Sequence, residues 1–333
     1  MQFQIPIQIK AIKPPVTYHD KLMLIGSCFT EHIGNYLSDV KFNVLQNPNG
    51  ILFDPQSVCR NLISYIDNKQ YKEKDLFYLN EAWHSWQHHS RFSNPDKTEA
   101  LSAINRSQEQ AHRFLQTADW LIITLGSSFI YKFSHTENEL LATEGKSVAN
   151  CHKAPAKLFN KHLSTIEETV TALDGTLFRL FHFNPKLKII FTISPVRHLR
   201  DGVVENNRSK ARLLEAVHHL VNKFEKLYYF PAYELVIDVL RDYRFYDIDM
   251  AHPNYAATQF VLENFFEYCV DAQSKMLSEE IRKIIIAKNH KPFNAASQQH
   301  KQFLESTAAK IKQLQAQHSY LDFTTELAYF LQQ

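Results

Sequence analysis

Short, largely apolar segments recur along the chain, and each ends at a glycine or serine. The clearest are residues 22–25 (before Gly26), 120–125 (before Gly126) and 188–193 (before Ser194). Apolar runs of this length are typical of strands buried on both faces of a parallel sheet. Helix-length segments separate them, so the pattern predicts an α/β fold with right-handed crossovers.

The intervening segments carry helix and turn signals. Helices are expected at about 30–39, 54–67, 94–116, 155–183, 209–226 and 253–275. Further strands are expected at 41–46, 129–133 and 235–239, with a strand-and-loop excursion at 76–95 and polar loops at 135–154 and 200–207. Beyond residue 277, helical periodicity with many charges predicts two or three more helices. We therefore divide the chain into a domain at 1–275 and a helical extension at 276–333.

The composition argues against a nucleic-acid-binding protein, a membrane protein and a disulfide-rich protein. A formal net charge of +2 predicts no strong attraction to nucleic acid or to an anionic membrane. No run of about 18 apolar residues indicates a membrane span, and residues 1–15 lack the order of a signal peptide. The four cysteines form no CxxC pair, so neither a zinc site nor a disulfide framework is expected. We infer a reduced, cytoplasmic location.

Glycine is scarce, with only seven in 333 residues, so its positions are informative. Gly26, Gly50 and Gly126 each follow a predicted strand. Open α/β sheets build their sites from the loops at strand ends. These three glycines therefore mark a candidate site.

Ser27 follows the first of these glycines, shortly before a predicted helix. A helix N-terminus stabilises developing negative charge, and its free backbone N–H groups can donate to an oxyanion. The position is typical of a nucleophile or a phosphate loop. The alternative is an ordinary helix N-cap, where serine is favoured.

A second candidate lies in residues 246–254 (YDIDMAHPN). An aspartate three residues before a histidine can place its carboxylate on Nδ1 of the ring, as Asp249 and His252 would here. The alternative is a surface turn in which Asp249 is only a cap. The functional interpretation depends on the conjunction of this loop with Ser27.

The block GSCFT at 26–30 resembles the one that names the GSCFA family, a bacterial group related to SGNH hydrolases. Further blocks are similar to that family in order and spacing: 47–50 (NPNG), 83–93 (WHSWQHHSRFS), 148–153 (VANCHK), 194–198 (SPVRH) and 249–253 (DMAHP). The resemblance spans about residues 22–264. It implies a three-layer α/β/α SGNH-hydrolase-like parallel sheet, with 1–275 as the hydrolase domain and 276–333 as a C-terminal helical appendage.

The resemblance also implies roles for individual residues. Ser27 would be the nucleophile, with Asp249 and His252 completing a Ser-His-Asp triad. Backbone N–H groups of Ser27 and Gly50 would hold the oxyanion. SGNH enzymes have an asparagine two residues after a strand-end glycine, and here that place holds Ser128.

We predict that Asn150, not Ser128, supplies the missing side-chain donor near Ser27. The serine hydroxyl is shorter, whereas Asn150 lies in a loop that can fold over the crevice. The alternative is that Asn150 bonds to the backbone of its own loop, as asparagine often does.

Cys28 is a rival nucleophile, because a thiolate beside a histidine is strongly nucleophilic. In the histidine-rich segment, strand alternation would place His89 and Arg91 on one face. That face would be a substrate wall or ordinary aromatic packing, since no carboxylate or cysteine completes a metal ligand set. Arg197 and His198 follow a buried strand and are expected to face the crevice, with a surface ion pair as the alternative.

The expected substrate-binding residues are Cys28, Gly126, Ser128, His89, Arg91, His152, Arg197 and His198. The leading function is ester hydrolysis or acyl transfer on a small-molecule or carbohydrate ester, with no cofactor and no metal. The alternatives are an inactive SGNH-fold module that binds a glycan or peptide, and an enzyme that depends on Cys28. The sequence predicts no oligomeric state.

Overall fold

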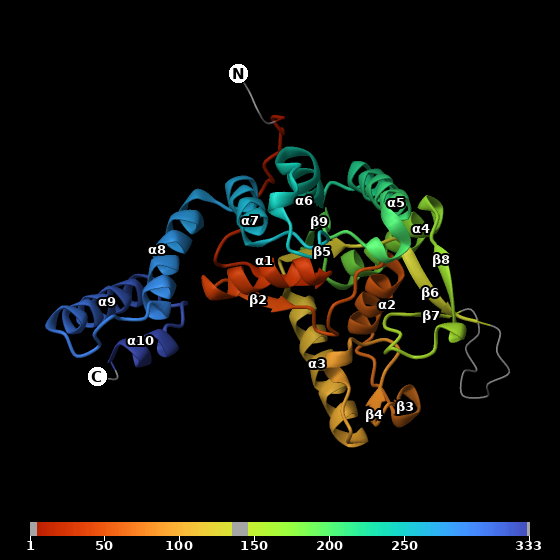
Figure 1. Ribbon diagram of the computed structural model, residues 1–333, viewed down its shortest axis with the longest axis horizontal. Coiled ribbons are helices and arrows are strands. Elements are labelled where there is room, and N and C mark those ends of the chain that lie inside the picture. Colours follow the sequence, from red (N-terminus) through yellow and green to blue (C-terminus); the bar gives the residue numbers. More distant parts are fainter. Residues whose placement is uncertain (1–4, 135–145, 332–333) are drawn as a thin grey trace.

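The computed structural model describes residues 5–134 and 146–331 (Figure 1). A five-stranded sheet lies at its centre. In spatial order its strands are β2 (Asn43–Gln46), β1 (Lys21–Gly26), β5 (Trp120–Leu125), β9 (Lys188–Ile193) and β10 (Leu227–Tyr229). All neighbours in this sheet are parallel. The α/β fold with a parallel sheet, expected from the apolar runs, is confirmed.

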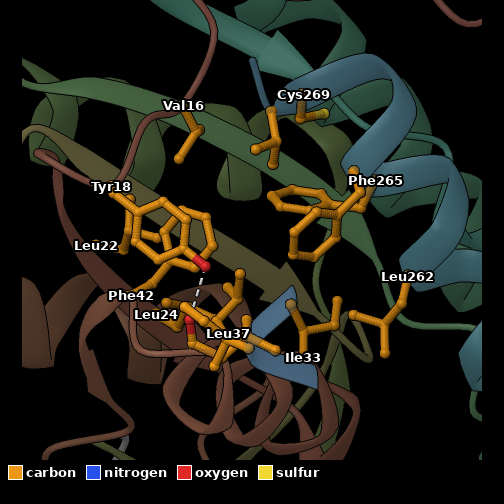
Figure 2. Close-up of a cluster of buried hydrophobic side chains, with 14 of the residues drawn as sticks. Val16, Tyr18, Leu22, Leu24, Ile33, Leu37, Phe42, Leu262, Phe265 and Cys269 are labelled. Atoms are coloured by element: carbon orange, nitrogen blue, oxygen red, sulfur yellow. Dashed lines mark hydrogen bonds between the residues drawn. The ribbon is translucent and has the colours of Figure 1, made fainter. Parts of the chain in front are cut away.

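Helices α1 (Cys28–Asp39) and α7 (Tyr255–Cys269) cover one face of the sheet. Figure 2 shows Leu22 and Leu24 of β1 packed with Ile33 of α1 and Phe265 of α7. In the same cluster the Tyr18 hydroxyl donates to Val40 O at 2.8 Å. The packing of α1 against β1 positions the start of the helix, and therefore Ser27, at the end of the strand.

Four helices cover the opposite face of the sheet: α2 (Pro55–Ile66), α3 (Lys97–Thr117), α4 (Ile166–Phe183) and α5 (Gly202–Lys223). Met23, Ile123 and Phe191 point into this second core, and all three are fully buried. Alternate strand residues thus face opposite helix layers, as the period of two requires. The result is the expected three-layer α/β/α architecture.

Two small antiparallel sheets lie outside these layers. Strand β3 (Phe77–Leu79) pairs with β4 (Ala82–His84), while β6 (Phe129–Phe133) pairs with β7 (Ser147–Val148) and β8 (Phe159–Leu163). Because β4 ends at His84, the strand alternation expected to place His89 and Arg91 on one face is wrong. A turn follows instead, in which the His88 N–H donates to Ser85 O at 3.1 Å.

Two elements differ from the sequence expectation. The helix predicted from residue 155 begins at Ile166, because residues 159–163 pair with β6 and Thr165 forms a capping box with Glu168. The last strand is β10, whereas residues 235–239, expected as a strand, continue α6 (Ala232–Glu234) as a π-helix. The loop expected at 135–154 falls partly on 135–145, outside the described residues.

The C-terminal helices are α8 (Ala272–Asn289), α9 (Gln298–Gln317) and α10 (Thr324–Leu331), and they extend from one side of the α/β core (Figure 1). Their buried side chains, such as Ile281 and Ile311, are continuous with the core around α1 and α7. Lys41 and the buried Glu326 form an ion pair at 2.8 Å. The appendage is therefore packed on the core, and α8 runs across the boundary at 275/276.

Cys28, Cys59, Cys151 and Cys269 are all free thiols. Within 5–134 and 146–331, no helix combines the length and apolarity needed to cross a bilayer.

His88 makes the stability of the fold sensitive to acid. Its ring is fully buried, with Nδ1 2.8 Å from the Ser85 hydroxyl, and burial lowers its pKa to about 3. Below about pH 6.5 the His88 ring therefore binds a proton in the unfolded chain but stays neutral in the folded chain. This contribution is complete above pH 6.5 and is lost as the pH falls, by about 2 kcal/mol at pH 5.

We expect His88→Gln to remove this dependence. In urea unfolding, the free-energy difference between the protein and the variant should shrink by about 2 kcal/mol from pH 7 to pH 5. The exposed His219→Gln is the matched control and should follow the unsubstituted protein. A pH-independent difference for His88→Gln would contradict the prediction.

Candidate active site

The carboxyl ends of β1 and β5 lie at the point where the strand order reverses. The chain passes from β1 outward to β2, and the later strands continue on the other side of β1. In open α/β sheets, ligands bind in the crevice at this reversal. Ser27 follows β1 and Gly126 follows β5, so two of the expected site segments are brought together here.

Ser27 occupies the N-cap position of α1, yet its hydroxyl forms no capping hydrogen bond. The residue is 2% exposed, and its Oγ has no hydrogen-bond partner within the described ranges. An N-cap serine ordinarily bonds a backbone N–H in the first helical turn. The hydroxyl is therefore not used in the way that the capping alternative requires.

Asn47 holds the backbone just before Ser27. Its Oδ1 accepts from the Gly26 N–H at 2.9 Å, and Asn47 itself has a left-handed φ of 41°. Gly26 has a φ of 150°, and a Cβ there would overlap the carbonyl of Thr124. Glycine is thus required at the strand end. Asn47 lay in a block that resembles the family, but no role was assigned to it from sequence.

Asp249 and His252 form the pair expected from their spacing. Nδ1 of the histidine lies 2.6 Å from Asp249 Oδ2, while Oδ1 accepts from the backbone N–H groups of Ala251 and His252 at 2.9 and 3.0 Å. These bonds lower the pKa of Asp249 to about 2, and the bond from the His252 N–H has the largest effect. The carboxylate is ionised at neutral pH and directs Nδ1 to be the protonated ring nitrogen, which leaves Nε2 to accept a proton.

Arg197 contacts and stabilises the loop that carries Asp249 and His252. Its N–H donates to Ala251 O at 3.0 Å, and its guanidinium lies 4.4 Å from the centre of the Tyr246 ring. The surface ion pair considered for this segment does not form, because Asp201 pairs with Lys161 and Glu205 with Arg208. The loop of the pair is therefore tied to the end of β9.

The third contact of a triad is not made in this structure. Within the described residues Ser27 Oγ has no partner, so it is not hydrogen-bonded to His252. The Asp249–His252 loop is bonded to the segment after β9, which is separated from β1 only by β5. Such catalytic hydrogen bonds are often long in unliganded enzymes and shorten when substrate binds.

The backbone donors proposed for the oxyanion already have acceptors. The Ser27 N–H donates to Thr124 O at 3.2 Å, and the Gly50 N–H donates to Asn47 O at 2.8 Å. Gly50 has a φ of 86°, and a Cβ there would overlap the side chain of His89. Holding an oxyanion with these N–H groups requires both bonds to lengthen or to be shared.

The two side-chain candidates also have partners. Ser128 is fully buried and its hydroxyl donates to Ser209 O in α5 at 3.1 Å. Oδ1 of Asn150 accepts from the His152 N–H at 2.8 Å, which is the local turn considered as its alternative. An amide donates only from its Nδ2 group, so this bond leaves the prediction that Asn150 donates to the oxyanion untested.

His89 and Arg91 cover the loop after β2. The Arg91 guanidinium donates to the carbonyls of Asn47 and Pro48, and lies 3.8 Å from Glu31 of α1. Burial lowers the pKa of His89. Arg91 thus stabilises the loop that holds Gly50, a use of its charge that the sequence did not indicate.

Cys28 is the first residue of α1 and is half-buried. Burial raises the pKa of its thiol above the usual value. A raised pKa leaves less thiolate at neutral pH, and the thiolate is the reactive form. The environment of Cys28 therefore disfavours it as a nucleophile.

His152, expected near the substrate, belongs to an aromatic cluster of the β3–β4 excursion. Its Nε2 lies 2.8 Å from Ser85 O, and its ring lies 4.7 Å from that of His84. Burial lowers its pKa to about 4. Its ring also contacts those of Phe77 and Trp86.

Lys210 of α5 was missed by sequence reasoning. It is 1% exposed, and its Nζ donates to Gly126 O at 2.5 Å and to Ser194 O at 2.7 Å, which joins the ends of β5 and β9. Burial lowers its pKa to about 7. A lysine in a helical segment ordinarily indicates a solvent-facing side, so no sequence signal distinguishes it.

Across residues 5–134 and 146–331, no three His, Cys, Asp or Glu side chains converge as a metal site. The chemistry that these residues can support is proton transfer at His252, oriented by Asp249, together with nucleophilic attack by Ser27.

Six chains of solved structures match this chain, and three of them are esterases of low similarity. A carbohydrate esterase family 3 protein from Talaromyces cellulolyticus has 10% identity and a TM-score of 0.36, and the match covers 79% of this chain and 99% of that chain. A family 3 carbohydrate esterase from Clostridium thermocellum has 10% identity and a TM-score of 0.32, with 80% of this chain and 98% of that chain covered. An acetyl xylan esterase from the rumen bacterium Butyrivibrio proteoclasticus has 14% identity and a TM-score of 0.37, with 76% of this chain and 64% of that chain covered. Among curated proteins, none matches the chain.

Comparison with protein families is decisive. The model of the GSCFA family matches residues 21–265, and that of the GSCFA domain protein, C-terminal domain, matches residues 281–333. The first match covers the central sheet, Ser27 and the Asp249–His252 loop. The chain belongs to the GSCFA family.

Proposed function

We propose that the protein is a serine-dependent esterase or acyltransferase in which Ser27 attacks an ester-linked acyl group. His252 takes the proton of Ser27 as general base, and Asp249 orients the ring and stabilises its charged form. The observation that carries the proposal is the hydroxyl of Ser27, which occupies a helix N-cap without capping it. The preformed Asp249–His252 pair at the same edge of the sheet supports it.

The ester in this proposal is carried by a carbohydrate or another small molecule, because SGNH hydrolases often act on acetylated carbohydrate. We place the reaction in a reduced cytoplasm, which the four free thiols support. The proposal requires neither a cofactor nor a metal ion.

A specific observation favours a second candidate, a non-catalytic module that binds a glycan or peptide. The hydroxyl of Ser27 is buried without a bond to His252, and the N–H groups of Ser27 and Gly50 are already paired. An enzyme must release these groups when substrate binds, whereas a binding module need not.

Fluorophosphonate labelling separates the two functions. An activated serine reacts with this probe, so peptide mass spectrometry should find the adduct on Ser27 in the folded protein and not in heat-denatured protein. An unlabelled Ser27 in folded protein would favour the binding module. Ester turnover that iodoacetamide abolishes would instead move the nucleophile to Cys28.

A further inference from the structure

His198 is an expected site histidine whose ring lies close to the end of a central strand. Its backbone N–H donates to Asn206 Oδ1 at 2.9 Å, and its ring lies 4.9 Å from that of Phe53. Its Nε2 would lie 3.3 Å from a Cβ built on Gly126. The imidazole is thus held close to the end of β5, the strand that neighbours β1 in the sheet.

The Nε2 atom of His198 is buried and has no hydrogen-bond partner within the described residues. A buried polar group without a partner costs free energy, on the order of 1–3 kcal/mol, and a catalytic role is one reason for which such a group is kept. Open α/β sheets bind substrates outside the carboxyl ends of the strands where the strand order reverses, which here is the side of Ser27 and Gly126.

Attack on an ester creates a negative oxygen that needs hydrogen-bond donors. The Ser27 and Gly50 N–H groups donate to backbone carbonyls, and the Ser128 hydroxyl donates to Ser209 O. These three groups already have acceptors, so a further side-chain donor, as an alternative to Nδ2 of Asn150, would complete the site.

We infer that His198 supplies that donor, from Nε2, to the oxyanion formed by attack of Ser27. The inference rests on the proposed function and adds to it a catalytic residue. In the step, Ser27 Oγ bonds to the acyl carbon, the π electrons of the carbonyl move to its oxygen, and the Ser27 proton passes to His252. His198 donates a hydrogen bond to the oxygen and keeps its own proton. Collapse of the intermediate returns the electrons, and His252 gives its proton to the departing alcohol.

The charges around His198 suit a neutral donor. Burial, then the Lys210 ammonium, then Lys161 and the charge of His252 lower its pKa to about 4, against a raising contribution from Asp201. At neutral pH the ring therefore carries a single proton and does not compete with His252 as a charged acid. Neutral imidazole serves as a hydrogen-bond donor to developing oxyanions in other enzymes.

Two substitutions of equal length test the inference. His198→Gln keeps an N–H donor close to the position of Nε2, whereas His198→Met fills similar space with no donor. For p-nitrophenyl acetate we expect kcat to fall about a hundredfold or more in His198→Met, and less than about tenfold in His198→Gln. The acidic limb of the kcat/KM profile should stay in place in His198→Gln, because His252 remains the base. His218→Ala, in α5 and packed on Tyr229, is the control for removal of a histidine and should leave kcat unchanged.

Equal, large losses in both variants would overturn the inference and assign His198 a role that needs the imidazole itself. Unchanged kcat in His198→Met would overturn it as well. The rate of fluorophosphonate labelling distinguishes failure of the donor role of His198 from failure of the proposed function. If Ser27 is labelled at the same rate in His198→Met, only the donor role of His198 is wrong. If Ser27 of the unsubstituted protein is not labelled, the proposed function fails and this inference fails with it.

Discussion

Ser27→Ala is expected to lower the turnover of p-nitrophenyl acetate by about 10⁴-fold while the protein stays folded. The loss is large because covalent catalysis disappears with the nucleophile and only the remaining site accelerates attack by water. Steady-state kinetics at saturating ester, compared with the uncatalysed rate, measures it.

The same substitution should leave stability unchanged or raise it by about 1 kcal/mol. Removing a buried hydroxyl that has no hydrogen-bond partner removes a desolvation cost and breaks no bond. Activity and stability would then move independently, as they do where a residue is kept for function. Urea unfolding measures the second effect.

Cys28→Ala is the companion variant for Ser27→Ala, because it deletes the neighbouring nucleophile. It should retain most of the turnover, since burial raises the pKa of the Cys28 thiol. Turnover that is retained in Ser27→Ala and lost in Cys28→Ala would show that Cys28, and not Ser27, is the nucleophile.

Asp249→Asn is expected to lower kcat by about 10³-fold to 10⁴-fold. Asparagine keeps an oxygen for the backbone N–H groups of Ala251 and His252, so the loop should hold its shape. The group facing Nδ1 of His252 becomes a donor, which forces the ring into the tautomer with its proton on Nε2. In that tautomer Nε2 cannot accept the proton of Ser27.

The exposed Asp247, two residues earlier in the loop, offers the matched control. Asp247→Asn changes the charge by the same amount and should alter kcat less than about twofold, since surface charges act weakly. Equal effects of the two variants would show that the charge of the loop matters and not the contact with His252. A kcat in Asp249→Asn within tenfold of the original would remove Asp249 from the mechanism.

Most of the secondary structure could be predicted from local sequence patterns. Strands β1, β5 and β9 lay where apolar runs indicated them, β2 where apolar and polar residues alternate, and the cap of α2 at an Asp-Pro pair. These signals depend only on neighbouring residues. Residues 159–163 depended on a partner strand, and their β-structure became visible only with β6 in place. The valine- and isoleucine-containing run at 235–239 has strand composition, yet its packing places it in a helix.

The candidate site divides in the same way. A DxxH spacing of three residues is local, so the contact of Asp249 with His252 could be predicted from sequence and is present at 2.6 Å. Burial of Lys210 between the ends of β5 and β9 depends on how α5 packs on the sheet, and no local signal indicates it. Whether Ser27 reaches His252 likewise depends on two segments 225 positions apart.

By itself, the sequence determined the parallel α/β class, the position of Ser27 at a strand end and the pairing of Asp249 with His252. Hydrophobic period, glycine placement and short spacing decide these features within a few residues. Only the tertiary structure decided which polar groups are already paired. It bonds the Ser27 and Gly50 N–H groups to carbonyls, turns Ser128 toward Ser209 and leaves Nε2 of His198 without a partner. A donor finds its acceptor in space, and long-range packing sets that distance.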